Sequence, residues 1–306
     1  MKTDLILTCG DPAGIGPEII ARWAEENAGL AERVTVAGPA SWLERTPSLA
    51  AFRRLPVGSP AFAAIPGQPT EEGAATALAA MEEAAAGCQR GDYRAVVTGP
   101  VSKIWMQRAG FPHPGQTEFF EARWGGQAVM GFTGGGLRLA LATWHIPLRE
   151  VPSALDETKL ERAVRAAGKL AALDGIDRPR VAVCGLNPHA GEEGLLGTEE
   201  VDWIEPALRR WRHDRPELRG PLPGDTVFWR ARQGEFDAIV ALYHDQGLAP
   251  LKAVAFDEAV HITLGLPHLR VSPDHGTAFS IAGKNQAAHR SLTQAVALAL
   301  RAPQTG

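Results

Sequence analysis

Cysteine is scarce in this sequence: there are three among 306 residues, widely spaced and without any CxxC pair. An odd, scattered set argues against a disulfide framework and favours a reducing cytoplasm. No apolar run approaches the roughly 18–20 residues that cross a bilayer, so no membrane-spanning helix is expected. The first residues, MKTDLILTCGDPAG, lack the hydrophobic segment and small-residue cleavage site of a signal peptide. A net charge of −4 gives no overall basic surface, so nucleic acid is not an expected partner.

Short apolar runs alternate with longer stretches of helical periodicity along the chain. We predict strands at residues 4–8, 33–37, 95–98, 129–133, 137–143, 180–184, 238–243 and 260–264. We predict helices from about residue 17 and over residues 71–88, 157–173, 199–212 and 289–301. Strands that alternate with helices are typical of an α/β protein with a largely parallel sheet, and a chain of this length suits two such domains.

Conspicuous polar or glycine-rich turns follow most of the predicted strands. They are residues 9–17, 98–103, 144–145, 187–192 and 243–247. In an α/β sheet, ligands bind outside the carboxyl ends of the strands. We therefore expect the functional site to be built from these turns.

Three of these turns contain a histidine: His145, His189 and His244. Imidazole is the usual nitrogen ligand of Zn²⁺ and other borderline divalent ions, and three protein ligands with an open position form a catalytic arrangement. A single histidine in a turn more often caps the turn or bonds the backbone, and no HxxxH or HExxH spacing supports a metal here. Three at strand ends favour a metal site assembled by folding, and the turn-capping interpretation stays open.

The first glycine-rich turn, at residues 9–17, matches neither GxGxxG nor a P-loop. Its glycines indicate either a tight strand-to-helix turn or a close approach of the backbone to a ligand. Three cations, Lys103, Lys252 and Arg270, are either candidates to bind an anionic substrate or ordinary solvated charges. A guanidinium matches carboxylate and phosphate better than an ammonium does, which favours Arg270.

Taken together, these segments resemble the 4-hydroxythreonine-4-phosphate dehydrogenase family of pyridoxal phosphate biosynthesis. The resemblance runs almost from end to end of the chain and depends on long, rare motifs. They are GDPAGIGPE at 10–18, TGPVSK at 98–103, GQTEFF at 115–120, LATWHIPL at 141–148, CGLNPHAGEEGLLGTEE at 184–200, GPLPGDT at 220–226, YHDQGLAPLK at 243–252 and ITLGLPHLRVSPDHGTAFSIAGK at 262–284.

The resemblance implies an isocitrate/isopropylmalate dehydrogenase-like fold, with two α/β domains, an interdomain cleft and assembly as a homodimer. Residues 1–105 plus 265–306 are expected to form the domain on the NAD side. Residues 106–264 are expected to form the second domain, with the metal ligands and the dimer contacts. The active site is expected to be shared between the two subunits.

A divalent metal is part of what the resemblance implies. His145, His189 and His244 match the family's three metal ligands, which are drawn from both subunits. Zn²⁺ is the first expectation for this set, with Co²⁺ or Mg²⁺ as alternatives. Asp245, next to His244, is a candidate for proton transfer or for supporting the ligand, and a purely structural carboxylate is equally open.

The resemblance also implies a small phosphorylated substrate. Thr117, Lys252 and Arg270 match the family's substrate-binding positions, and Lys252 is in addition a candidate catalytic residue. Two further substrate-facing positions depart from the family pattern. Gln116 stands where the family usually has histidine, and His261 stands where it usually has asparagine. Gln116 retains hydrogen-bonding capacity but cannot titrate, whereas His261 can carry charge.

The segment of His275, Gly276, Thr277 and Ala278, with residues 281–283 beyond it, resembles the adenosine-side loop for NAD or NADP. The implied reaction is NAD-dependent oxidation of 4-phosphohydroxy-L-threonine at its C3 hydroxyl, followed by decarboxylation to 3-amino-2-oxopropyl phosphate. One alternative is a paralogous metal-dependent dehydrogenase of another phosphorylated hydroxy acid or of a cis-diol carboxylate. Another is a non-catalytic protein that binds a metal or nucleotide and keeps the fold.

Overall fold

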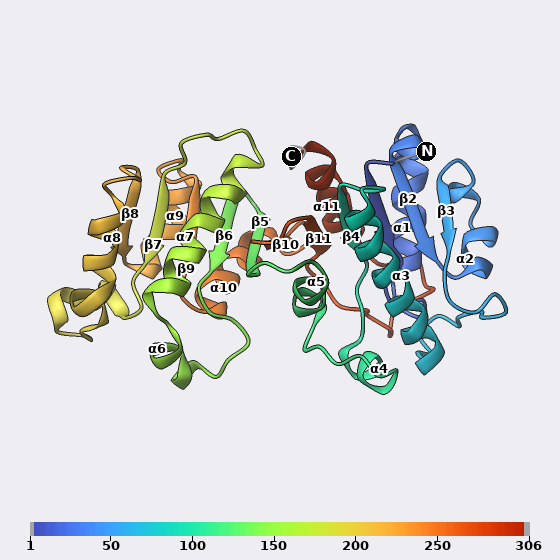
Figure 1. The fold of residues 1–306 in the computed structure, drawn as a ribbon, viewed down its shortest axis with the longest axis horizontal. Coiled ribbons are helices and arrows are strands. Elements are labelled where there is room, and N and C mark those ends of the chain that lie inside the picture. Colours follow the sequence, from blue (N-terminus) through green and yellow to red (C-terminus); the bar gives the residue numbers. More distant parts are fainter. Residues whose placement is uncertain (1–2, 303–306) are drawn as a thin grey trace. The chain divides into compact units, whose positions relative to one another are not determined.

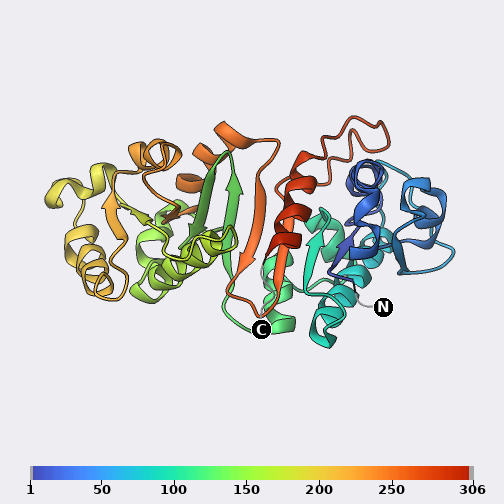
Figure 2. The ribbon, with the colours of Figure 1, turned by 90° about the horizontal axis from the view of Figure 1, so that it is seen from above.

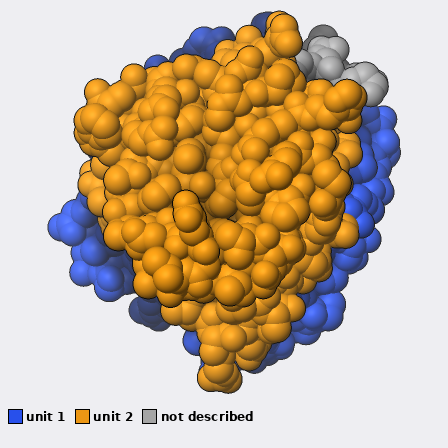
Figure 3. All heavy atoms as spheres, turned by 90° about the vertical axis from the view of Figure 1, so that its left-hand side faces the viewer, with its two compact units in different colours: residues 1–128, 266–306 blue, residues 129–265 orange. Residues whose placement is uncertain are grey.

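The computed structural model describes residues 3–302 and divides the chain into two compact units, which are coloured separately in Figure 3. Unit 1 comprises residues 1–128 and 266–306, and unit 2 comprises residues 129–265. In both units strands alternate with helices along the chain (Figure 1). The predicted α/β class is confirmed. None of the described helices is both long and apolar enough to span a membrane.

The strands of unit 1 are all parallel and lie in the order β3-β2-β1-β4-β11. They are β1 (Leu5–Thr8), β2 (Val34–Gly38), β3 (Arg53–Pro56), β4 (Ala95–Thr98) and β11 (Leu269–Pro273). The helical elements of this unit are α1 (Gly16–Glu26), η1 (Ala28–Arg33), α2 (Ala40–Arg45), η2 (Pro47–Leu49), α3 (Glu71–Arg90), α4 (Lys103–Arg108), α5 (Gln116–Trp124) and α11 (Arg290–Arg301).

Helix α3 shows how the sequence determines its own boundaries. The Thr70 hydroxyl accepts a hydrogen bond of 3.0 Å from the Gly73 N–H, which caps the first turn. Gly91 ends the helix in the left-handed region, with a φ of 73°. The alanine-rich face between these ends is buried against β1 and β4, because small side chains let the helix approach the sheet closely.

Residues 106–128 lie in unit 1, whereas the resemblance predicts them to be part of the second domain. The physical reason is the aromatic face of α5. Phe119, Phe120 and Trp124 are buried and pack in one cluster with Met81 and Ala84 of α3. This cluster ties α5 to the core of unit 1.

The strands of unit 2 lie in the order β10-β5-β6-β9-β7-β8. They are β5 (Val129–Gly134), β6 (Leu137–Leu141), β7 (Val181–Cys184), β8 (Leu218–Leu222), β9 (Ala238–Ala241) and β10 (Val260–Leu264). Strand β5 is antiparallel to both of its neighbours, and the run β6-β9-β7-β8 is parallel. The helical elements are η3 (Leu148–Glu150), α6 (Val151–Ala154), α7 (Glu157–Ala172), η4 (Pro188–Gly194), η5 (Glu200–Ile204), α8 (Glu205–Trp211), α9 (Gly224–Arg232) and α10 (His244–Ala255).

Helices cover both faces of the unit 2 sheet (Figure 2). Helices α9 and α10 pack on one face, where Val227 and Leu251 join a buried cluster with Leu139, Leu141 and Ile239. Helix α7 packs against β6 and β9 from the other face. Because both faces are covered, the ends of the strands are the exposed parts of the sheet where a ligand can reach the backbone.

Candidate active site

The three predicted metal ligands follow three neighbouring parallel strands of unit 2. His145 comes after β6, His244 after β9 and His189 after β7, and β9 lies between β6 and β7. Since parallel strands end at the same edge of a sheet, all three histidines belong to one edge.

His145 and His244 lie together at this edge. Their ring centroids are 5.5 Å apart, with an angle of 38° between the ring planes. His145 has a φ of 51°, in the left-handed region that residues other than glycine rarely adopt. His244 is the first residue of α10, and its Nδ1 lies 2.7 Å from Oδ1 of Asp245. In the tautomer whose Nδ1 carries the proton and donates this bond, Nε2 keeps its lone pair. This neutral tautomer is the form of histidine that can bind a metal through Nε2.

His189 does not join this pair within one chain. Its Nδ1 lies 3.4 Å from Oε2 of Glu192, and its side chain is exposed. Within residues 3–302, no group of three His, Cys, Asp or Glu side chains is arranged to hold a metal ion. The structure therefore brings together two of the three predicted ligands, and the chemistry of this pair fits two positions of a metal site.

Arg270 is the centre of a second polar cluster, which lies in unit 1. Its Nε and Nη2 donate to the Thr98 hydroxyl at 3.1 and 2.8 Å, and Nη2 also donates to the Gln116 side-chain oxygen at 2.9 Å. The Gln116 amide nitrogen donates to the Gly99 carbonyl at 3.1 Å, which fixes the orientation of this side chain. Burial lowers the pKa of Arg270 to about 9, and Glu118 opposes this shift. Arg270 is therefore a buried cation at neutral pH.

The first turn of α5 adjoins this buried cation. Gln116 and Thr117 occupy the turn, Gly115 precedes it, and Thr117 is buried. Lys103 and the Glu118 carboxylate are both close by, because a Cβ added to Gly115 would lie 4.0 Å from Cε of Lys103 and 3.1 Å from Oε2 of Glu118. A helix N-terminus with a guanidinium and an ammonium beside it is a suitable setting for a phosphate or carboxylate. Sequence reasoning missed Thr98, although this residue opens the TGPVSK motif.

The predicted cofactor segment packs against the first glycine-rich turn. The Thr277 carbonyl accepts a hydrogen bond of 2.9 Å from the Ile15 N–H, and a Cβ on Gly14 would lie 2.9 Å from that carbonyl oxygen. Gly16 is packed more tightly still, since a Cβ there would lie 1.9 Å from the Cys9 carbonyl oxygen. These contacts favour the tight-turn interpretation of residues 9–17. Ala278 has a φ of 44°, so this segment is itself tightly turned.

Lys252 and His261 both lie in unit 2. Lys252 lies on α10, the helix that begins at His244, and its Nζ is 5.9 Å from the Phe256 ring centroid. His261 lies within β10, where its ring stacks on Phe132 with centroids 4.9 Å apart. Its side chain is 8% exposed, so this departure from the family pattern is accommodated inside the sheet.

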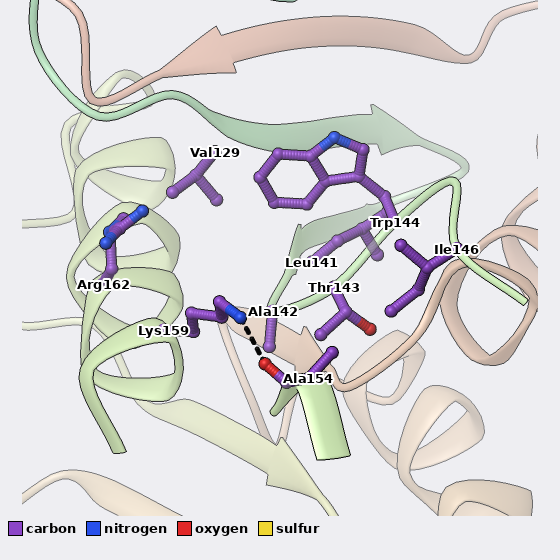
Figure 4. Close-up of a pocket in the computed structure, with 9 residues that line it drawn as sticks. All are labelled: Val129, Leu141, Ala142, Thr143, Trp144, Ile146, Ala154, Lys159 and Arg162. Atoms are coloured by element: carbon purple, nitrogen blue, oxygen red, sulfur yellow. Dashed lines mark hydrogen bonds between the residues drawn. The ribbon is translucent and has the colours of Figure 1, made fainter. Parts of the chain in front are cut away.

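A small cavity lies beside the loop that holds His145 (Figure 4). It has a volume of about 170 Å³ and is mainly apolar, with Lys159 and Arg162 as its charged members. Lys159 donates a hydrogen bond to the Ala154 carbonyl at its margin. The remaining lining residues are Val129, Leu141, Ala142, Thr143, Trp144 and Ile146. This mainly apolar space does not resemble a site for a phosphorylated substrate.

Known proteins resemble this chain over almost its whole length. The family model of the pyridoxal phosphate biosynthetic protein PdxA matches residues 21–299. A 4-hydroxythreonine-4-phosphate dehydrogenase from Bradyrhizobium diazoefficiens is 44% identical, over 97% of this chain and 96% of the relative.

Solved structures agree with this assignment. The crystal structure of a 4-hydroxythreonine-4-phosphate dehydrogenase from Klebsiella pneumoniae has a TM-score of 0.86 and 35% identity, with 98% of each chain covered. A terephthalate 1,2-cis-dihydrodiol dehydrogenase from Burkholderia xenovorans has a TM-score of 0.73 and 30% identity, also with 98% of each chain covered.

A more distant likeness tests the predicted fold. An isocitrate dehydrogenase from Methylococcus capsulatus has a TM-score of 0.51 at 16% identity, covering 97% of this chain and 85% of that chain. At this identity the likeness shows the fold alone, and it confirms the predicted isocitrate dehydrogenase-like fold. The chain belongs to the family of the pyridoxal phosphate biosynthetic protein PdxA.

Proposed function

We propose that this protein is a 4-hydroxythreonine-4-phosphate dehydrogenase. It oxidises the C3 hydroxyl of 4-phosphohydroxy-L-threonine with NAD or NADP and decarboxylates the product to 3-amino-2-oxopropyl phosphate. The observation that carries the proposal is the histidine pair of His145 and His244, with Asp245 orienting one ring, in a chain of this family.

The proposed metal site uses His145 and His244 of one subunit and His189 of a second copy, with Zn²⁺ as the ion. Neutral nitrogen ligands suit this ion, and Asp245 keeps His244 in the tautomer that binds it. When bound, a divalent ion would supply Lewis-acid chemistry that favours ionisation of the substrate hydroxyl, and NAD would supply the acceptor for the hydride from C3.

The residues of the chain bind and orient the substrate in this proposal. Arg270 and the first turn of α5, with Gln116 and Thr117, bind its anionic groups. Lys252 lies two turns beyond His244 on α10 and supplies a further positive charge, or a proton, to the reacting end. His261 lies in β10 and contributes to substrate choice.

The NAD site in this proposal is the segment of His275, Gly276, Thr277 and Ala278. Its small residues allow the dinucleotide to approach the backbone, and the bond from Ile15 to Thr277 holds the segment on unit 1.

A homodimer is part of the proposal because His189 lies apart from the other two ligands. Apolar side chains are exposed on the same unit as the three histidines, which supports an interface there. Leu195 is 82% exposed and Leu196 45%, just beyond His189, and Leu148 is 69% exposed, just beyond His145.

The direct test is NADH formation from 4-phosphohydroxy-L-threonine before and after removal of divalent ions by a chelator. We expect activity to disappear on chelation and to return with Zn²⁺, Co²⁺ or Mg²⁺, the most effective ion identifying the metal. Full activity in the metal-free protein would refute the scheme.

A second candidate is a paralogous dehydrogenase that acts on a cis-diol carboxylate or on another phosphorylated hydroxy acid. The likeness to the terephthalate 1,2-cis-dihydrodiol dehydrogenase favours it, as do the departures at Gln116 and His261. Comparing kcat/KM for 4-phosphohydroxy-L-threonine and for a panel of cis-dihydrodiol carboxylates and hydroxy acids separates the two candidates.

A further inference from the structure

The segment that contains His189 has an unusual backbone. Six consecutive residues have positive φ: 52° at His189, 54° at Ala190, 79° at Gly191, 46° at Glu192, 58° at Glu193 and 97° at Gly194. Left-handed conformation costs roughly 1–2 kcal/mol for each residue other than glycine. A run that includes four such residues persists only where surrounding contacts enforce it.

A buried carboxylate lies at the centre of this left-handed turn. Glu200, the first residue of η5, is 2% exposed. Its Oε1 accepts hydrogen bonds from the backbone N–H groups of Leu186 and Asn187, at 2.7 and 2.8 Å. Its Oε2 accepts from the side-chain amide of Asn187 at 2.9 Å. These neutral donors stabilise a carboxylate that would otherwise be unfavourable in the interior.

The same carboxylate fixes the path of the backbone into His189. Glu200 accepts hydrogen bonds from both the backbone and the side chain of Asn187, whose side-chain amide also donates to Glu199 at 2.7 Å. The Asn187 carbonyl in turn accepts a hydrogen bond of 3.1 Å from the Ala190 N–H. Gly191 closes the turn over the carboxylate, since a Cβ there would lie 2.7 Å from Oε2 of Glu200. The strand end before His189 and the turn after it are thus both built around one side chain.

We infer that Glu200 is a positioning residue that holds His189 in the left-handed turn from which this histidine binds the metal. The inference rests on the proposed function, which makes His189 a ligand. Glu200 acts on metal affinity through the backbone of residues 186–191. Removing it releases the strained turn, so that His189 must be ordered again each time a metal binds.

The test is the affinity of the full-length protein for Co²⁺, followed by its visible absorption and by competition with a chromophoric chelator. We expect Glu200→Ala to weaken binding by roughly 10–100-fold, as supporting groups around metal ligands typically do. Glu200→Gln keeps one oxygen for the two backbone donors, so we expect it to bind Co²⁺ more tightly than Glu200→Ala but less tightly than the wild-type protein. Glu193→Ala removes an exposed carboxylate from the same turn and serves as the matched control, with wild-type affinity expected.

A second variant keeps the inference testable if Glu200→Ala does not fold. Gly191→Ala leaves the carboxylate in place but forces a Cβ against it, and we expect it to weaken Co²⁺ binding as well. Wild-type affinity in both Gly191→Ala and the folded Glu200 variants would overturn the inference alone. Failure of the wild-type protein to bind Co²⁺, or unchanged binding in His145→Ala, would overturn the proposed metal site and the inference with it.

Discussion

Arg270 holds its charge in the interior of unit 1 through neutral partners. A hydroxyl and a carboxamide, from Thr98 and Gln116, accept hydrogen bonds from its guanidinium, and the charge of Glu118 raises its pKa against the effect of burial. Because these two partners are uncharged, they orient the guanidinium without neutralising it.

Gln116→Ala should lower kcat/KM for 4-phosphohydroxy-L-threonine. It removes an acceptor from a buried guanidinium, at a cost of about 1.5–3 kcal/mol, which corresponds to a fall in kcat/KM of roughly 10–160-fold. Gln116→His, which retains a ring nitrogen as acceptor, should lose less. Steady-state kinetics on the three proteins measure the difference. Equal values for the alanine variant and the parent protein would show that Gln116 does not support Arg270 during turnover.

Asp11 provides a test based on pH. The Ala13 N–H donates to its Oδ1 at 3.0 Å, while its buried Oδ2 has no hydrogen-bond partner among the described residues. Burial raises the pKa of this carboxyl. A carboxyl whose pKa is higher in the folded than in the unfolded state favours folding at low pH, and this contribution is lost as the pH rises through the folded value.

We therefore expect Asp11→Asn to raise Tm at neutral pH, because the raised pKa means that the ionised carboxyl is less favourable in the folded than in the unfolded state. The advantage should shrink as the pH falls toward about 4, where the carboxyl gains its proton in both states. Thermal unfolding of the two proteins across this range measures the effect. A gain in Tm that grows on acidification would contradict the argument.

Elements with strong local signals were predictable from the sequence, and elements without them were not. Strand β4 was predicted to the residue, and α3 was predicted to within two residues because its cap and alanine periodicity mark both ends. Helix α10 was missed, since it contains Gly247 and Pro250, which weaken a helical pattern. Strand β11 was missed because Arg270 interrupts its apolar run.

From the sequence, the site could be predicted only as a set of residues that follow strands, without their arrangement in space. The adjacency of His145 and His244 depends on β6 lying beside β9, a pairing between segments nearly a hundred residues apart that no local pattern encodes. Glu200 was missed for the same reason. Its role depends on the turn at 186–191 closing over it, which only the folded backbone reveals.

The packing of α5 on α3 gives a prediction at the level of elements. Phe119 is fully buried and belongs to the same cluster as Met81 and Ala84 of α3. Phe119→Ala should lower the free energy of unfolding by about 3–5 kcal/mol, and Phe119→Leu by less. Urea unfolding measures both. A loss below about 1 kcal/mol in the alanine variant would show that α5 does not belong to the core of unit 1.

At the scale of the whole molecule, the proposed sharing of the metal site can be tested by mixing inactive variants. His145→Ala and His189→Ala should each abolish activity. In a mixed dimer, one of the two sites would receive all of its ligands from unaltered residues. Random pairing makes about half of the dimers mixed, so about a quarter of the sites should recover.

The control for this experiment mixes His145→Ala with His244→Ala. If these two ligands come from the same subunit, no mixed dimer contains an intact site and no activity returns. Recovery in both mixtures, or in neither, would refute the proposed division of ligands. NADH formation after joint refolding of each pair is the measurement.

The histidine pair and the buried arginine belong to different units, each with its own core. Under the proposed function, substitutions around Arg270 would therefore change which anion is recognised without disturbing the side chains that support His145 and His244. After a gene duplication, one copy of the enzyme could therefore change its substrate while it keeps the same redox chemistry. Such a separation agrees with the names of two similar proteins, one named for a phosphorylated amino acid and the other for an aromatic cis-dihydrodiol.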